Sequence, residues 1–218
     1  MASAVTNGIL RYEIDFDALE AAVTPDTRLF ILCNPHNPVG LAHSAEDLRA
    51  VADLAAQYDA TVVSDEIHGP LTYADATFTP FLSVSDAARK VGICVTAASK
   101  AWNLAGLKCA IMVTAGGPNQ VIVGSMPLEV FWRTSLLGLK ASIAAYRDGV
   151  DWFDGILSSL DANRQLLASL LAERLPAVGY RMPQSTYLAW LDFRELGWGD
   201  DPAAHILEHS KVALSNGP

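Results

Sequence analysis

The chain has 218 residues, of which 51% are hydrophobic and 18% charged, and its formal net charge is −9. This composition is sufficient for a buried core and excludes a charge-rich disordered chain. The acidic balance also argues against nucleic-acid binding, which needs a basic face. Three widely spaced cysteines and the absence of a basic, apolar leader predict reduced thiols in a cytoplasmic protein.

The first half of the chain alternates short β-branched runs with helical patterns. A helix is expected at residues 16–23, and RLFILC at residues 28–33 is typical of a buried strand. Ser44 and Asp47 form a capping-box pattern at the start of the next helix. ATVVS at residues 60–64 is the second strand. Strand, helix and strand in this order predict a parallel βαβ unit with a right-handed crossover.

The rest of the chain predicts two more sheet strands and a helical region. VGICVTA at residues 91–97 is a third strand, and CAIMVT at residues 109–114 is a fourth that we expect to run antiparallel to it. A turn cluster, GGPNQ, interrupts the longest uncharged stretch, so no membrane span is expected. Helices follow from about residue 128, and TYLAWLDF at residues 186–193 predicts a strand that opens a smaller α+β unit.

Polar clusters come directly after three of the predicted strands. They are NPHNPVG at residues 34–40, DEIH at residues 65–68, and SK at residues 99–100. Ligands of open α/β sheets bind outside the carboxyl ends of the strands, so we expect the clusters to form one site. An amide, a carboxylate and a lysine together suit pyridoxal 5′-phosphate (PLP). The lysine forms a Schiff base with its aldehyde, and the carboxylate keeps its pyridine nitrogen protonated.

These motifs resemble a known family. NPHNPVG, SDEIH and SKAWNLAGLK are similar to signatures of the class I/II aminotransferase superfamily, PLP enzymes of fold type I, and the DEIH form resembles its cystathionine β-lyase-like C–S lyase branch. The resemblance implies an α/β PLP-binding large domain at residues 1–150 and part of a small α+β domain at residues 151–218. It also implies a homodimer that acts on a small-molecule amino acid.

The resemblance assigns roles to one residue in each of the three clusters. Lys100 corresponds to the lysine that forms the Schiff base and moves the substrate proton. Asp65 corresponds to the partner of the pyridine nitrogen, and Asn37 to the donor that reaches the phenolate oxygen of PLP. All three roles are therefore expectations about one cofactor.

Three further residues are candidates for cofactor contacts. His68 takes the place of a tyrosine that touches the same phenolate oxygen in aminotransferases, Lys108 falls where the family has a basic phosphate ligand, and Ser99 is a polar neighbour. The chain departs from the family at Ala97, where a phosphate-binding Ser or Thr is frequent, and at Ser185, where Gly is common. No compact metal-ligand spacing is present, so no metal is expected.

The activity implied by the resemblance is cleavage of a C–S bond in cystathionine or a cysteine conjugate. Transamination remains open as an alternative, because both reactions begin when Lys100 removes the α-proton. A non-catalytic fragment is a second alternative. The chain resembles the middle of such an enzyme: the family's phosphate loop and ring-stacking aromatic, and its carboxylate-binding arginine, have no counterpart here.

Overall fold

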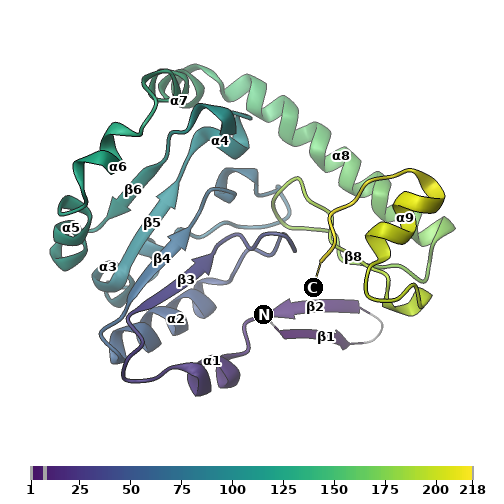
Figure 1. Ribbon diagram of the computed structural model, residues 1–218, viewed down its shortest axis with the longest axis horizontal. Helices are drawn as coiled ribbons and strands as arrows, with labels where there is room; N and C mark the ends of the chain where they lie inside the picture. Colours follow the sequence, from purple (N-terminus) through teal and green to yellow (C-terminus); the bar gives the residue numbers. More distant parts are fainter. Residues whose placement is uncertain (1, 7–8, 218) are drawn as a thin grey trace.

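The computed structural model describes residues 2–6 and 9–217, and its centre is a four-stranded sheet (Figure 1). The strands lie in the order β3 (Leu29–Cys33), β4 (Thr61–Asp65), β5 (Gly92–Thr96) and β6 (Ile111–Thr114). β3, β4 and β5 are parallel, and β6 is antiparallel to β5. The predicted parallel unit and the antiparallel fourth strand are both confirmed.

Helix α2 (Ala45–Gln57) forms the crossover between β3 and β4. Its predicted capping box is present: the Asp47 amide donates to Ser44 Oγ at 3.0 Å, and the Ser44 amide donates to Asp47 Oδ2 at 3.3 Å. Figure 1 shows α2 and α3 (Asp86–Val91) together on one side of the sheet. The apolar side of α2 is buried there and contributes Leu48, Val51, Ala52, Leu54 and Ala55 to the core.

The opposite face of β3 is open, so the prediction of a buried strand was wrong for Leu29 and Ile31. Phe30 and Leu32 lie in the core, whereas Leu29 and Ile31 are 51% and 79% exposed. Successive side chains of a strand point to opposite faces, and the described elements cover only one of them here. The pattern of apolar residues correctly predicted a strand. It did not predict which face of the strand would be covered.

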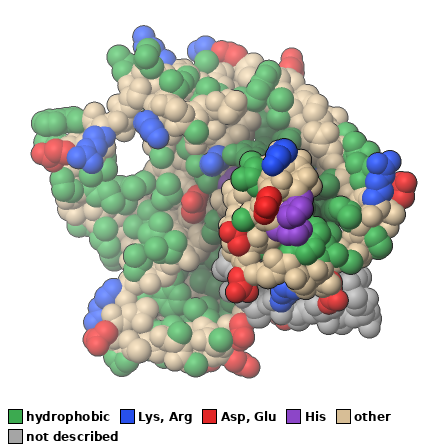
Figure 2. All heavy atoms as spheres, turned by 45° about the vertical axis from the view of Figure 1, so that its right-hand side comes forward, with side chains coloured by type: hydrophobic (Ala, Val, Ile, Leu, Met, Phe, Trp, Pro, Cys, Tyr) green, Lys and Arg blue, Asp and Glu red, His purple; other side chains and the backbone are tan. Residues whose placement is uncertain are grey.

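A helical region follows the sheet, as expected. It comprises α5 (Gly117–Gly124), α6 (Leu128–Trp132), α7 (Leu136–Asp148) and the long α8 (Val150–Arg174). Figure 2 shows many hydrophobic side chains on the surface of the molecule. Exposed apolar residues of this region and of β6 include Ile111, Met112, Val113, Val121, Leu128, Trp132, Leu136 and Leu137. No helix in the described ranges is long and apolar enough to cross a bilayer.

The carboxyl-terminal part contains the short strands β7 (Gly179–Tyr180) and β8 (Leu191–Asp192) and helix α9 (Pro202–Ser210). The predicted strand at residues 186–193 was mostly wrong, because only Leu191–Asp192 pairs, and Thr186 has a φ of +74° that extended chain does not adopt. A boundary between residues 150 and 151 stays a prediction; it falls beside Gly149, which separates α7 from α8.

The remaining elements are short. They are β1 (Ala2–Thr6) and β2 (Ile9–Glu13), which pair antiparallel, the helices α1 (Phe16–Ala22) and α4 (Ala98–Ala101), and the 3₁₀ helices η1 (Gly69–Leu71), η2 (Phe81–Ser83), η3 (Ala105–Leu107) and η4 (Arg194–Leu196). The helix expected at residues 16–23 is thus confirmed.

Candidate active site

The carboxyl ends of the three parallel strands lie level with one another. Cys33 pairs with Asp65 and Asp65 with Val95, so β3, β4 and β5 reach the same edge of the sheet. Two backbone hydrogen bonds extend the ladders into the loops, from the Asn34 amide to the Asp65 carbonyl (2.9 Å) and from the Glu66 amide to the Val95 carbonyl (2.8 Å). The edge therefore brings the polar clusters together, as the sequence predicted.

Asn37 lies in the loop that follows β3. The loop is closed by the His36 amide, which donates to the Leu41 carbonyl at 2.7 Å, and by the Gly40 amide, which donates to the His36 carbonyl at 2.8 Å. The Asn37 amide donates to Cys33 Sγ at 3.3 Å, while the residue itself is exposed. A rigid loop thus presents the Asn37 side chain to solvent, and its contact with a cofactor stays a prediction.

Asp65, His68 and Lys100 lie together at this edge. Asp65 is half-buried, and its Oδ1 accepts a hydrogen bond from the Ile67 amide at 3.1 Å. His68 is 2% exposed, and both of its ring nitrogens are buried without a hydrogen-bond partner among the described residues. Burial lowers the pKa of His68, the charge of Lys100 lowers it further, and Asp65 opposes both effects. Both charges therefore act on one imidazole, and the described part of the chain gives its nitrogens no hydrogen-bond partner.

The candidate residues after β5 and after η3 differ in how far they are exposed to solvent. Ser99 and Lys100 are half-buried on α4, which begins at Ala98 and has the buried Ala97 as its N-cap. Lys108 is exposed in a left-handed conformation, and its carbonyl accepts a hydrogen bond from the Ser135 amide at 3.3 Å. The structure thus places Lys100 near His68, while the cofactor contacts of Lys100, Lys108 and Ser99 stay predictions.

Comparison with known families agrees with this arrangement. Residues 7–217 match the model of the family described as aminotransferase class I and II. The chain belongs to this family. Its lysine after β5, its aspartate at the end of β4 and its asparagine after β3 are the positions from which the resemblance to the family was drawn.

Relatives within the aminotransferase class I and II family include C–S lyases. Cystathionine beta-lyase of Corynebacterium glutamicum is 37% identical, and the match covers 94% of this chain and 55% of the relative. A protein of Mycobacterium tuberculosis is 44% identical, with 94% and 56% covered. The solved PLP-bound C–S lyase of Staphylococcus hominis has a TM-score of 0.81 at 26% identity, with 98% and 56% covered. The chain spans about half the length of the curated relatives that it matches.

Glu66 supports the candidate site from the core, and the sequence analysis did not identify this role. It is 7% exposed, and its Oε1 accepts hydrogen bonds from the Phe81 amide (2.7 Å), Ser64 Oγ (3.0 Å) and Cys94 Sγ (3.2 Å). Burial raises the pKa of Glu66. The alternation of side chains along β4 places Ser64 and Glu66 on the face opposite Asp65, and this pattern was the available signal. Glu66 therefore anchors the turn that carries Asp65 and His68.

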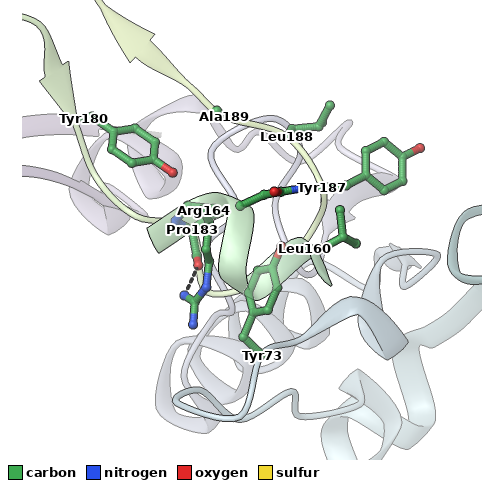
Figure 3. A pocket seen from close by; sticks show the side chains of 9 residues that line it. Tyr73, Leu160, Arg164, Tyr180, Pro183, Tyr187, Leu188 and Ala189 are labelled. Carbon is green, nitrogen blue, oxygen red and sulfur yellow. Dashed lines mark hydrogen bonds between the residues drawn. The ribbon is translucent and has the colours of Figure 1, made fainter. Parts of the chain in front are cut away.

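A second missed feature is a small cavity beside the site, with a volume of about 140 Å³ (Figure 3). The ring of Tyr187, at its border, also lies against His68, with the ring centroids 5.9 Å apart. The residues that line it are Tyr73, Leu160, Asn163, Arg164, Tyr180, Pro183, Tyr187, Leu188 and Ala189. Its walls come from segments far apart in the sequence, so no local motif could have indicated it.

Proposed function

We propose that this chain carries the lysine-bearing part of a PLP-dependent C–S β-lyase that cleaves cystathionine or a cysteine conjugate. The observation that carries the proposal is the placement of Lys100 and Asp65 around His68 at the level ends of β4 and β5. The relationship to cystathionine beta-lyases supports this reaction over others that the same fold performs.

The residues present fit PLP. A buried imidazole with two unpartnered nitrogens loses the free energy of its hydrogen bonds, roughly 1–3 kcal/mol for each buried group, unless a ligand or water supplies partners. The phenolate oxygen of PLP is an acceptor of the required kind. His68 and the amide of Asn37 would hold this oxygen, Asp65 would keep the proton on the pyridine nitrogen, and Ser99 and Lys108 would contact the phosphate.

Bound PLP supplies an electron sink that stabilises negative charge at the substrate α-carbon. Lys100 would hold the cofactor through its amine in the resting enzyme. Its Nζ, once freed by the amino group of the substrate, would accept the α-proton. The electron pair left at the α-carbon would then form the α,β double bond as the β-carbon–sulfur bond breaks, and the bonding pair would leave on the sulfur as a thiolate.

We further propose a cytoplasmic homodimer that binds a small amino acid. All three cysteines are free thiols, which suits a reducing compartment. Large exposed apolar residues such as Trp132 (74%) and Leu137 (70%) support an assembly that covers them, because monomers seldom leave such patches in water.

The test is to mix the purified protein with PLP and then with cystathionine. We expect a visible absorption band from lysine-bound cofactor that is lost in Lys100→Ala, and release of pyruvate and ammonia without an added keto acid. Strict dependence on a keto-acid acceptor would indicate the aminotransferase alternative. A folded, soluble protein that shows no band would refute the proposal for this chain and leave the non-catalytic fragment.

A further inference from the structure

One buried segment joins the two cofactor-side loops of the site. Residues 183–186, here called the junction segment, lie between β7 and β8. Ser185 and Thr186 within it have no exposed surface. Its polar groups are directed at three other parts of the chain, which are the loop that carries Asn37, the turn that carries His68, and helix α8.

The first set of contacts fixes the junction segment to the Asn37 loop. The amides of Gln184 and Ser185 both donate to the Gly40 carbonyl, at 2.8 and 3.1 Å, and the Ala42 amide donates to Gln184 Oε1 at 3.2 Å. Gly40 has a φ of +67°, and a Cβ added to it would lie 2.6 Å from the Ser185 carbonyl oxygen and would also clash with the Pro183 side chain. The two backbones are therefore in direct contact.

The second set of contacts fixes the junction segment to the His68 turn. Ser185 Oγ donates to the His68 carbonyl at 3.1 Å, in a buried environment. Just beyond the turn, the Tyr73 amide donates to the Gln184 carbonyl at 3.0 Å, and Tyr73 Oη donates to the Thr186 carbonyl at 2.6 Å. The His68 carbonyl thus accepts from the Leu71 amide of its own turn, at 2.9 Å, and from a side chain more than 100 residues away in the sequence.

Arg164 of helix α8 binds the backbone of the junction segment. The Arg164 side chain is 7% exposed, and its Nη1 donates to the Pro183 carbonyl at 2.7 Å, as Figure 3 shows. Its other nitrogens donate to Asp75 Oδ1 at 2.8 Å and to Asp161 Oδ1 at 2.6 Å. The guanidinium carbon also lies 4.0 Å from the centre of the Tyr73 ring. The segment therefore has little freedom to shift.

We propose that Ser185 is a positioning residue, and that through it the junction segment sets His68 and the Asn37 loop relative to each other. The inference rests on the proposed function, because it assumes that these two groups hold the same cofactor oxygen. A buried hydroxyl that donates to the His68 carbonyl leaves the imidazole free for the ligand, while its own backbone amide holds the other loop. One residue thus sets both groups.

The test compares Ser185→Ala with a matched control, Ser169→Ala, whose hydroxyl donates to the Gln165 carbonyl on the exposed side of α8. The ring-proton resonances of His68, assigned with His68→Gln, are recorded by NMR on folded protein without cofactor. We expect them to shift in Ser185→Ala beyond any change in the control. PLP affinity should fall by roughly threefold to tenfold, as expected for the loss of one buried hydrogen bond.

Unchanged His68 resonances in folded Ser185→Ala would overturn the proposal, because a residue that only stabilises the fold would leave the spectrum of the folded state as it is. If Ser185→Ala does not fold, Tyr73→Phe replaces it, since this variant removes only the hydroxyl that donates to the Thr186 carbonyl. The NMR readout needs no cofactor. Failure of wild-type protein to bind PLP would therefore refute the proposed function separately.

Discussion

Replacement of Glu66 tests how the turn at the candidate active site is held. In Glu66→Ala, the Phe81 amide and the Ser64 hydroxyl lose their acceptor inside the protein. A buried donor without a partner costs about 1–3 kcal/mol, and a thiol such as that of Cys94 contributes less. The hydroxyl can turn to another acceptor but the backbone amide cannot, so we expect the free energy of unfolding to fall by about 1–3 kcal/mol.

Glu66→Gln separates the hydrogen bonds from the charge, because it keeps a carbonyl acceptor of the same size. We expect its stability at neutral pH to lie within about 1 kcal/mol of wild type. Burial raises the pKa of Glu66 above its ordinary value of 4.5, so folding favours the protonated form. This contribution is fully present below pH 4.5 and is lost as the pH rises through the folded-state pKa. Wild type should therefore lose stability relative to Glu66→Gln as the pH increases.

The assay is urea unfolding followed by tryptophan fluorescence over a pH series. Glu173→Ala, at an exposed position of α8, is the control for removal of a carboxylate. A loss below about 1 kcal/mol in Glu66→Ala, which is the size of one ordinary hydrogen bond, would contradict the anchoring role. So would a difference between wild type and Glu66→Gln that grows toward low pH.

Three further predictions use the same unfolding assay. Arg164→Met removes the buried donor to the Pro183 carbonyl and should cost about 1–3 kcal/mol, because Asp75 and Asp161 are partly exposed and water can solvate them. Arg174→Met, on the exposed end of the same helix, should have little effect. Ser44→Ala removes the N-cap of α2 and should cost about 1 kcal/mol; no loss would mean that the capping box contributes nothing. Burial, reinforced by a neighbouring histidine, lowers the pKa of His36 from 6.5 to about 4, so its neutral ring stabilises the fold above pH 6.5 and this contribution is lost as the pH falls through 4. His36→Gln should flatten this acid-side decline, and an unchanged profile would refute the assignment.

Much of the sheet and of the site could be predicted from local sequence. Alternation of β-branched strands with an amphipathic helix indicated the parallel unit, and Ser44 with Asp47 indicated where α2 begins. The polar clusters were recognised because they follow directly after strands, and parallel strands end at a common edge. These features depend on residues that are neighbours in the sequence, or on one rule of sheet topology.

Other features depend on contacts between distant segments and appeared only in the folded chain. The sequence by itself determined the strands, the crossover helix and the polar clusters that lie at the edge of the sheet. Tertiary structure decided that Ile31 faces outward, that Thr186 interrupts a predicted strand, and that Ser185 reaches the His68 backbone. The physical reason is that propensity and periodicity act over one or two turns of chain, whereas burial and hydrogen bonding of a side chain are set by whichever segment the fold brings beside it.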